Sequence, residues 1–275
     1  KRHAGDGVYG PEELRDAAGA ICAARLISDV DAVTRAEASS HAEIPSYRSL
    51  DFGDLSRVQA ALGRRLFETT ADGEAVDCVH RTVAEYLAAA WLAKQVAAGL
   101  PLGRLLALIG IDGHPAAELR GLHAWLALHL PDHAITLIQA DPYGVLTYGD
   151  AASLLPSHRR ALLLALSELS RSDPWFRSGS WSLPALATLA RDDMVEEFRR
   201  VLHAPDANFA LRSCVLESIA LGPPLLPLPP ELLAVLRDAQ APYAERSEAL
   251  DALAKFGPAA RAAVVDTYRH ELALD

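Results

Sequence analysis

The sequence predicts a mainly α-helical protein, in which a small module with a β-hairpin precedes an array of helical repeats. Helix-sized apolar patterns, separated by Gly and Pro, fill most of the 275 residues. An Asp-Gly dipeptide at 72–73, followed by alternating apolar and polar residues, is typical of a hairpin. A segment that begins at Ala207 returns at Ala241, an offset of 241 − 207 = 34 residues, which indicates a repeat. We therefore predict two domains, at residues 1–98 and 99–275.

The composition argues against several classes of partner. Asp and Glu number 36 against 26 Lys and Arg, so the net charge of -10 disfavours nucleic acid as a partner. No apolar run reaches the roughly 18 residues that a membrane span needs, so we expect no membrane partner. The three cysteines are widely spaced and form no CxxC pair, which favours a reducing compartment. We predict a cytoplasmic protein.

Two helices are expected before the hairpin. Pro11, with acids in the turn that follows, marks a helix start, and this apolar pattern ends near Ser28. Residues 29–53 are mixed and polar, with Pro, Ser and Gly as breakers. Asp54 can cap a second, short helix that begins at Leu55 and has one apolar face.

The hairpin forms a small wing. From Ala75 to His80 apolar and polar residues alternate, which predicts a strand. The order helix, helix, hairpin resembles a winged-helix module, here with a further helix after the wing. We assign this winged-helix-like module to residues 1–98.

The helix after the wing carries several candidate structural residues. Thr82 and Glu85 have the T-x-x-E spacing of a capping box, in which each side chain accepts the backbone N–H of the other residue. Glu85 therefore has a predicted structural role. Tyr86 and Trp91 belong to an apolar stripe on a helix that is apolar nearly all round, which predicts burial between neighbours. The alanines at 88–90 would allow another backbone to approach closely.

Beyond Gly99 the sequence indicates antiparallel helices, with no convincing strand. The 34-residue offset is clearest over 195–256, where a helix pair is followed by its copy. Matching positions are Ala210 and Ala244, Arg212 and Arg246, Ser213 and Ser247, Leu216 and Leu250, and Phe209 and Tyr243. The unit lacks the Trp-Leu-Gly pattern of tetratricopeptides and the TPLHxA pattern of ankyrins. A HEAT-like repeat array is therefore the best match.

No self-contained active site is visible. The chain lacks GxxxxGK[ST], GxGxxG, HExxH and GxSxG patterns. His123, His129 and His133 form the densest histidine group. Pro131 interrupts their register and no cysteine completes a metal site, so we interpret them as structural. The acids at 192–197 fit a helix start better than catalysis. We expect no catalytic residue, no metal site and no enzyme activity in this chain alone.

The stretch CVHRTVAEYLAAAWL, which begins at Cys78, resembles a known signature. That signature, aromatic-x-His-x-x-aromatic-Gln-Glu-aromatic-x-Ala-Ala, closes the winged-helix domain of NACHT and related STAND ATPases. The residues that fit it are His80, Glu85, Tyr86, Ala88 and Ala89, and those that depart from it are Cys78, Val83 and Ala84. The resemblance covers about residues 12 to 160 and, more loosely, the repeats beyond.

The resemblance implies a role for His80. In such ATPases the winged-helix histidine reaches the β-phosphate of bound ADP and holds the inactive state closed, so His80 would be a nucleotide sensor. An imidazole at a strand end beside a helix N-terminus can donate to an anion. Because the chain has no phosphate loop, the resemblance implies a fragment whose ATP or ADP and Mg are bound by an upstream ATPase domain. The alternative is that His80 only packs at the wing.

Two functions follow for the whole chain. The leading one is the regulatory and sensor segment of a bacterial signal-transducing NACHT ATPase with a role in antiviral defence, whose repeats bind a protein or peptide trigger. The alternative is a free-standing HEAT-like scaffold that binds a protein or peptide. A winged-helix DNA-binding regulator is disfavoured by the acidic charge, and only scattered acids point to a hydrolase.

Overall fold

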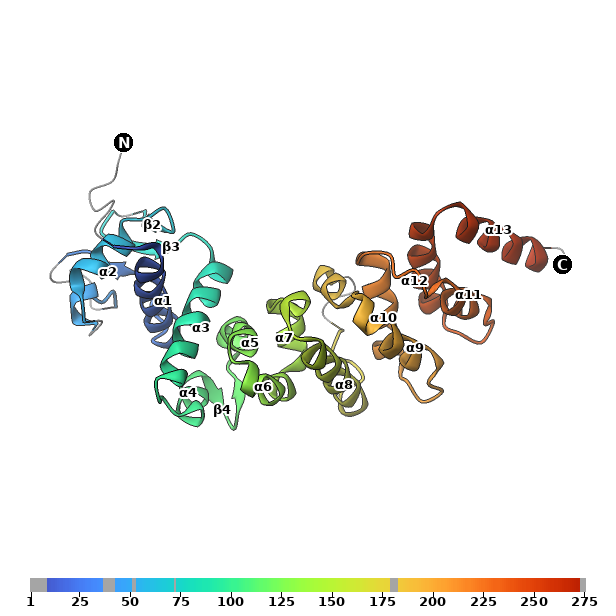
Figure 1. The fold of residues 1–275 in the computed structure, drawn as a ribbon, viewed down its shortest axis with the longest axis horizontal. Coiled ribbons are helices and arrows are strands. Elements are labelled where there is room, and N and C mark those ends of the chain that lie inside the picture. The colour runs from blue at the N-terminus through green and yellow to red at the C-terminus, as the bar shows by residue number, and fades with distance from the viewer. Residues whose placement is uncertain (1–8, 37–42, 51–52, 72, 179–182, 273–275) are drawn as a thin grey trace. The chain divides into compact units, whose positions relative to one another are not determined.

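The computed structural model describes residues 9–36, 43–50, 53–71, 73–178 and 183–272. In these ranges the chain is mainly helical with two small antiparallel sheets, which confirms the predicted fold class at that level. The chain divides into two compact units: unit 1, residues 1–141, and unit 2, residues 142–275 (Figure 1). None of the helices in the described ranges has both the length and the apolar composition that a membrane span requires.

The first two helices of unit 1 begin where the sequence predicts. Helix α1 (Pro11–Ile27) starts after Gly10, whose backbone N–H donates to a Glu13 carboxylate oxygen at 2.7 Å. Helix α2 (Leu55–Leu62) is capped by Asp54, whose Oδ1 accepts two backbone N–H groups of the first turn at 3.0 and 3.1 Å. Both starts follow from local capping chemistry, which is why the sequence alone predicts them.

A three-stranded antiparallel sheet follows the order β1 (Val33–Thr34), β3 (Ala75–Cys78), β2 (Phe67–Thr69). The predicted hairpin is therefore confirmed, and Gly73 at its turn has the left-handed φ of 80° that an Asp-Gly turn favours. The strand ends at Cys78, before the predicted end at His80, because His80 is already the cap of the next helix. Strand β1 has too few residues to show a periodic pattern in the sequence.

Helix α3 (Arg81–Ala97) packs against α1 on one side and against α5 (Arg120–His129) on the other (Figure 1). The predicted packing between two neighbours is confirmed, but the predicted burial is incomplete, because Val83 and Tyr86 are 37% and 38% exposed. The closest approach to α1 lies at Gly19, where an added Cβ would lie 2.6 Å from the Leu87 carbonyl oxygen and 2.8 Å from the Trp91 Cβ. The small residue that permits this approach is thus on α1, although the alanines of α3 are also buried.

The predicted capping box at Thr82 and Glu85 is wrong. His80 is the N-cap of α3, so Thr82 is the second helical residue and is exposed, and no side chain of the described residues caps this end. The box requires its Thr at the cap position, whereas the chain turns from strand to helix two residues earlier. Glu85 accepts instead a hydrogen bond from Arg81 Nε at 2.9 Å.

Unit 1 continues beyond the predicted boundary at 98 and 99 with α4 (Leu102–Ile109), α5 and α6 (Ala134–Ala140). The boundary is displaced because α5 packs on α3 and so joins the first core. A second hairpin, β4 (Gly110–Ile111) with β5 (His114–Pro115), contradicts the prediction of no strand in this region. Its Asp-Gly turn has φ values of 52° and 85° at its two residues, which is typical of a type I′ turn.

Unit 2 consists of helices connected by short turns and 3₁₀ segments. They are α7 (Pro142–Tyr148), α8 (Pro156–Ser172), α9 (Val195–His203), α10 (Phe209–Leu221), α11 (Pro229–Arg237), α12 (Tyr243–Leu253) and α13 (Pro258–Leu272). The starts of α11 and α12 each follow those of α9 and α10 by 34 residues, at 195 and 229 and at 209 and 243. The helix starts therefore follow the 34-residue offset of the predicted repeat.

Arginines join neighbouring helices of unit 2 across about one repeat length. The pairs are Arg159 with Asp193 at 2.9 Å, Arg199 with Glu231 at 2.6 Å and Arg212 with Glu245 at 2.8 Å. Their partners lie 34, 32 and 33 residues further along the chain. Each acid is at least half-buried, so the pairs fix the position of each helix pair against the next.

Candidate functional site

His80 lies at the point where β3 ends and α3 begins. Its side chain is exposed, and its backbone carbonyl accepts N–H groups of Val83 and Ala84 at 3.1 and 3.0 Å. The N-terminus of a helix of this length, 17 residues, carries a partial positive charge and backbone N–H groups without a helical partner. An anion at this end could therefore meet both the imidazole and the helix N-terminus.

A pair of buried thiols holds the strand end next to His80. The thiols of Cys22 on α1 and Cys78 on β3 are hydrogen-bonded to each other, and the Cys78 thiol donates to the His80 carbonyl oxygen at 3.5 Å. The hydrogen bond from Cys22 lowers the pKa of Cys78, against burial, and the pKa of Cys22 is raised. The sequence predicts buried apolar cysteines but not this hydrogen bond, which joins residues far apart in the chain.

Glu85 is a buried carboxylate between α3 and α5. The residue is only 6% exposed, and burial raises its pKa although Arg81 acts in the opposite direction. A Cβ added at Gly121 of α5 would overlap the Glu85 carboxylate. Arg81 also donates to the Glu118 carbonyl oxygen. These groups form a polar contact that fixes α3, and with it His80, against α5.

Tyr86 and Trp91 have packing roles on opposite sides of α3. The Tyr86 ring lies edge-on to Trp125 at 5.1 Å and to His129 at 4.8 Å between ring centroids. Trp91 is half-buried at the close approach of Gly19. Both residues therefore help to pack α3 against its neighbours, and neither contacts His80 in the interactions that the structure shows.

Two of the three clustered histidines pack in the core of unit 1. His123 is fully buried, and one of its ring nitrogens, Nε2, lies 2.8 Å from the Leu137 carbonyl oxygen. Burial lowers the pKa of both His123 and His129, so burial favours the neutral imidazole. Among the described residues no three side chains of His, Cys, Asp or Glu are grouped as they would be around a metal ion.

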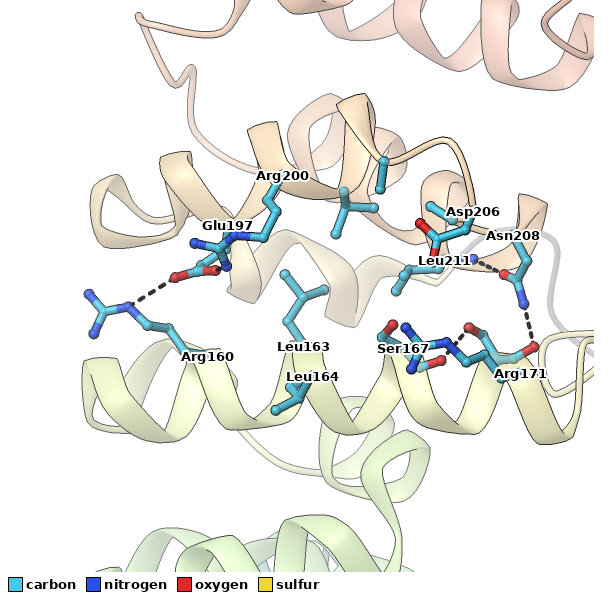
Figure 2. A pocket seen from close by; sticks show the side chains of 14 residues that line it. Arg160, Leu163, Leu164, Ser167, Arg171, Glu197, Arg200, Asp206, Asn208 and Leu211 are labelled. Carbon is cyan, nitrogen blue, oxygen red and sulfur yellow. Dashed lines mark hydrogen bonds and ion pairs between the residues drawn. The ribbon is translucent and has the colours of Figure 1, made fainter.

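Unit 2 contains a groove between α8 and the α9–α10 corner, which we call the α8–α9 groove (Figure 2). Its volume is about 370 Å³. Its apolar side chains include Leu163, Leu164, Val201 and Leu211, and its charged and amide side chains are Arg160, Arg171, Glu197, Arg200, Asp206 and Asn208. Leu164 is 60% exposed and adds an apolar side chain to the accessible surface of the groove.

The polar side chains lie at the two ends of the groove (Figure 2). At one end Glu197 forms ion pairs with Arg160, at 3.5 Å, and with Arg200. At the other end Asn208 caps α10 by accepting the Leu211 N–H at 3.0 Å, and its amide donates to the Ser170 carbonyl oxygen. The groove is therefore amphipathic. Several of the acids at 192–197 form ion pairs with arginines.

The sequence does not reveal which residues line this groove. Arg160 and Glu197 are separated by 37 positions, so only the fold brings them together. The helix periodicity and the repeat distance indicate that α8 and α9 are neighbours. They do not indicate which residues of α8 face α9, because the segment between these two helices is longer than the connections within the repeat. Comparison with protein-family models, with curated proteins and with solved structures finds no match to this chain.

Proposed function

We propose that the chain is the regulatory and sensor segment of a bacterial signal-transducing NACHT-type ATPase that acts in antiviral defence. In this proposal the first module is winged-helix-like and the helix pairs form a HEAT-like array. The observation that carries it is the position of His80, exposed at the N-terminus of α3 and held at a strand end by the Cys78 thiol, which donates to its carbonyl oxygen. The chain itself would not be an enzyme.

The chemistry of this end suits a phosphate. The imidazole and the free backbone N–H groups of α3 can both donate to phosphate oxygens of ADP held by an upstream ATPase domain, which would also bind ATP and Mg. Because α3 is fixed to α1 and α5, the position of His80 is linked to the rest of unit 1. Loss of the phosphate contact would destabilise the closed state, so that the population shifts from closed to open molecules.

The test uses the protein encoded by the complete gene. His80→Ala should lower the amount of ADP that copurifies with it and raise basal signalling, because one donor to the phosphate is lost. The matched control is His203→Ala, which removes another exposed histidine, in the last turn of α9. Nucleotide content is measured by chromatography after denaturation. Equal ADP content in the His80 variant and the control would overturn the sensor role.

The alternative, a free-standing scaffold that binds a protein or peptide, is favoured by the α8–α9 groove with its exposed Leu164. Groove and sensor are compatible, since the regulatory segment also requires a surface for its trigger. The two functions differ in what the gene encodes before Lys1. A phosphate-loop ATPase in the same reading frame supports the regulatory segment, and its absence supports the scaffold.

A further inference from the structure

Three aromatic side chains in unit 2 follow the repeat distance. Trp175, Phe209 and Tyr243 are spaced at 34 residues, as their numbers show, and are 77%, 42% and 83% exposed. Phe209 and Tyr243 are the first residues of α10 and α12, and Trp175 lies in the turn after α8. Large aromatic residues that remain in solvent at a regular interval along the chain are not required by the core. They indicate a surface for binding.

A small cavity opens between the first two of these rings, and we call it the Trp175 pocket. Its volume is about 100 Å³, which suits the end of one side chain rather than a nucleotide. The lining includes Trp175 and Phe209, and its polar members are Arg177, Ser178, Ser213 and Glu248. The pocket thus combines two aromatic rings with a carboxylate, and it is distinct from the α8–α9 groove.

The positive charge in the pocket is already matched. Arg177 forms an ion pair with Glu217, donates to Ser213 Oγ at 3.3 Å and lies 3.4 Å from the Cys214 sulfur. The second oxygen of Glu217 accepts the Leu183 N–H at 2.6 Å. Arg177 Nε is buried without a hydrogen-bond partner among the described residues. Because Glu217 neutralises the charge of the guanidinium, this N–H lacks only a neutral acceptor.

Glu248, in contrast to Arg177, forms no ion pair within the described chain. Its Oε1 accepts the Ser213 hydroxyl at 2.7 Å, whereas its Oε2 is buried without a hydrogen-bond partner in the described chain. A buried carboxylate oxygen without a partner costs free energy that a bound donor would recover. An anion would be repelled here by Glu217 and Glu248, and an apolar side chain would leave Oε2 unsatisfied.

We propose that the Trp175 pocket binds the cationic end of an arginine or lysine side chain of a partner peptide. The rings of Trp175 and Phe209 attract a cation at their faces, and Glu248 supplies the charge partner. A backbone carbonyl of the same peptide is the neutral acceptor that Arg177 Nε lacks. The inference rests on the proposed function for the partner being a protein or peptide, and it adds the chemistry of that partner.

Binding should depend on pH near neutrality. Burial raises the pKa of Glu248 to about 7, with Glu217 and Glu245 acting in the same direction and Ser213 and Arg177 in the opposite one. A bound cation favours the ionised carboxylate, so affinity for the cation should increase as pH rises through 7 and decrease below it.

The test titrates the chain with N-acetyl-arginine amide and, in parallel, with N-acetyl-citrulline amide, which has the same shape without the charge. Binding is followed by the NMR signal of the Trp175 indole N–H, identified by its loss in Trp175→Phe. We expect saturable binding at pH 8, about tenfold tighter for the arginine derivative, and a smaller preference at pH 6. Equal affinity for the two probes, or no saturation, would overturn the proposal.

Two variants and a control complete the experiment. Glu248→Gln should remove the preference for arginine, and Trp175→Ala, at an exposed position that is tolerant of change, should weaken binding of the arginine probe. Glu168→Gln removes the same charge from an exposed position of α8 outside the pocket and should leave binding unchanged. A preference that persists in Glu248→Gln would contradict the assignment. These results are independent of ADP retention, so failure of the pocket is distinguishable from failure of the His80 sensor.

Discussion

At the scale of single residues, the molecule contains glutamates whose buried environment disfavours the ionised form. Glu85, Glu245 and Glu248 all have a pKa that burial raises, although each has a polar partner. Glu85 and Glu245 are paired with Arg81 and Arg212. Glu248 accepts a hydrogen bond only from the Ser213 hydroxyl within the described chain, and burial raises its pKa to about 7. A neutral donor compensates burial of a carboxylate less well than a cation does.

The pKa of Glu248 predicts how the stability of unit 2 depends on pH. A carboxyl with a pKa raised from 4.5 to about 7 stabilises the folded state below pH 4.5 and loses that contribution as pH rises to 7. Glu248→Gln mimics the protonated form. It should therefore equal the parent in stability below pH 4.5 and exceed it above pH 7, by about 1 to 2 kcal/mol after allowance for solvent screening. Urea unfolding at pH 4, 6 and 8 checks this, and a constant difference across pH would contradict it.

At the scale of elements, helix packing depends on small residues at a few positions. Gly19 lets α1 approach α3, and Gly121 makes room for the Glu85 carboxylate between α3 and α5. Neither glycine lies at a turn or has a left-handed φ, so their role is space and not backbone freedom. Such glycines lower the helix propensity of their own helices, and the close packing that they permit compensates for that loss.

Gly121→Ala tests this packing. The added methyl group overlaps the Glu85 carboxylate, so unit 1 should lose about 1 to 3 kcal/mol of unfolding free energy. In the double variant with Glu85→Ala the loss should be less than the sum of the single effects, because the overlap is removed. The control is Gly103→Ala on α4, where nothing lies near the added carbon and the change should be neutral or stabilising. A loss as large in Gly103→Ala would show a helix effect rather than a packing effect.

The elements that the sequence predicts and those that it hides differ in their physical signals. Asp54 and Pro11 act on the adjacent turn of their own helix, so local chemistry is sufficient to place α1 and α2. The two-residue strands β1, β4 and β5 show no alternation, and only the Asp-Gly turn at 112–113 could have revealed the second hairpin. The wrong prediction of a capping box at Thr82 and Glu85 has the same origin. The motif specifies the spacing of two residues, but the packing of the whole module determines where the helix begins.

At the scale of the whole molecule, the sequence predicts the repeat but not the sites. The 34-residue offset follows from matching residues in the sequence and recurs in the starts of the helices. The α8–α9 groove and the Trp175 pocket, in contrast, depend on side chains that are distant in sequence, such as Trp175 and Glu248. The spacing of the three aromatic residues is the one signal of the pocket that the sequence carries, and only two of them fall in the repeat alignment.

A core substitution in one helix pair should act on its neighbours and not on unit 1. Phe198 of α9 is fully buried, and Phe198→Ala should cost about 3 to 5 kcal/mol. Because each pair contacts the next, hydrogen exchange should increase from α9 to α12 while α1 to α3 stay protected. Leu226→Ala, at a residue that is 80% exposed, is the control and should change little. Equal loss of protection in both units would show that they unfold together.

The arginine–acid pairs span 32 to 34 residues and Trp175, Phe209 and Tyr243 are 34 residues apart, and this limits how such an array can change in evolution. Duplication of a complete unit of 34 residues would preserve both, because every arginine would still reach its acid and every ring would keep its interval. An insertion of any other length inside a helix would turn the following side chains away from their partners. Variation in length is therefore expected in whole units or in the connecting loops, and related chains with longer or shorter arrays should differ in steps of that size.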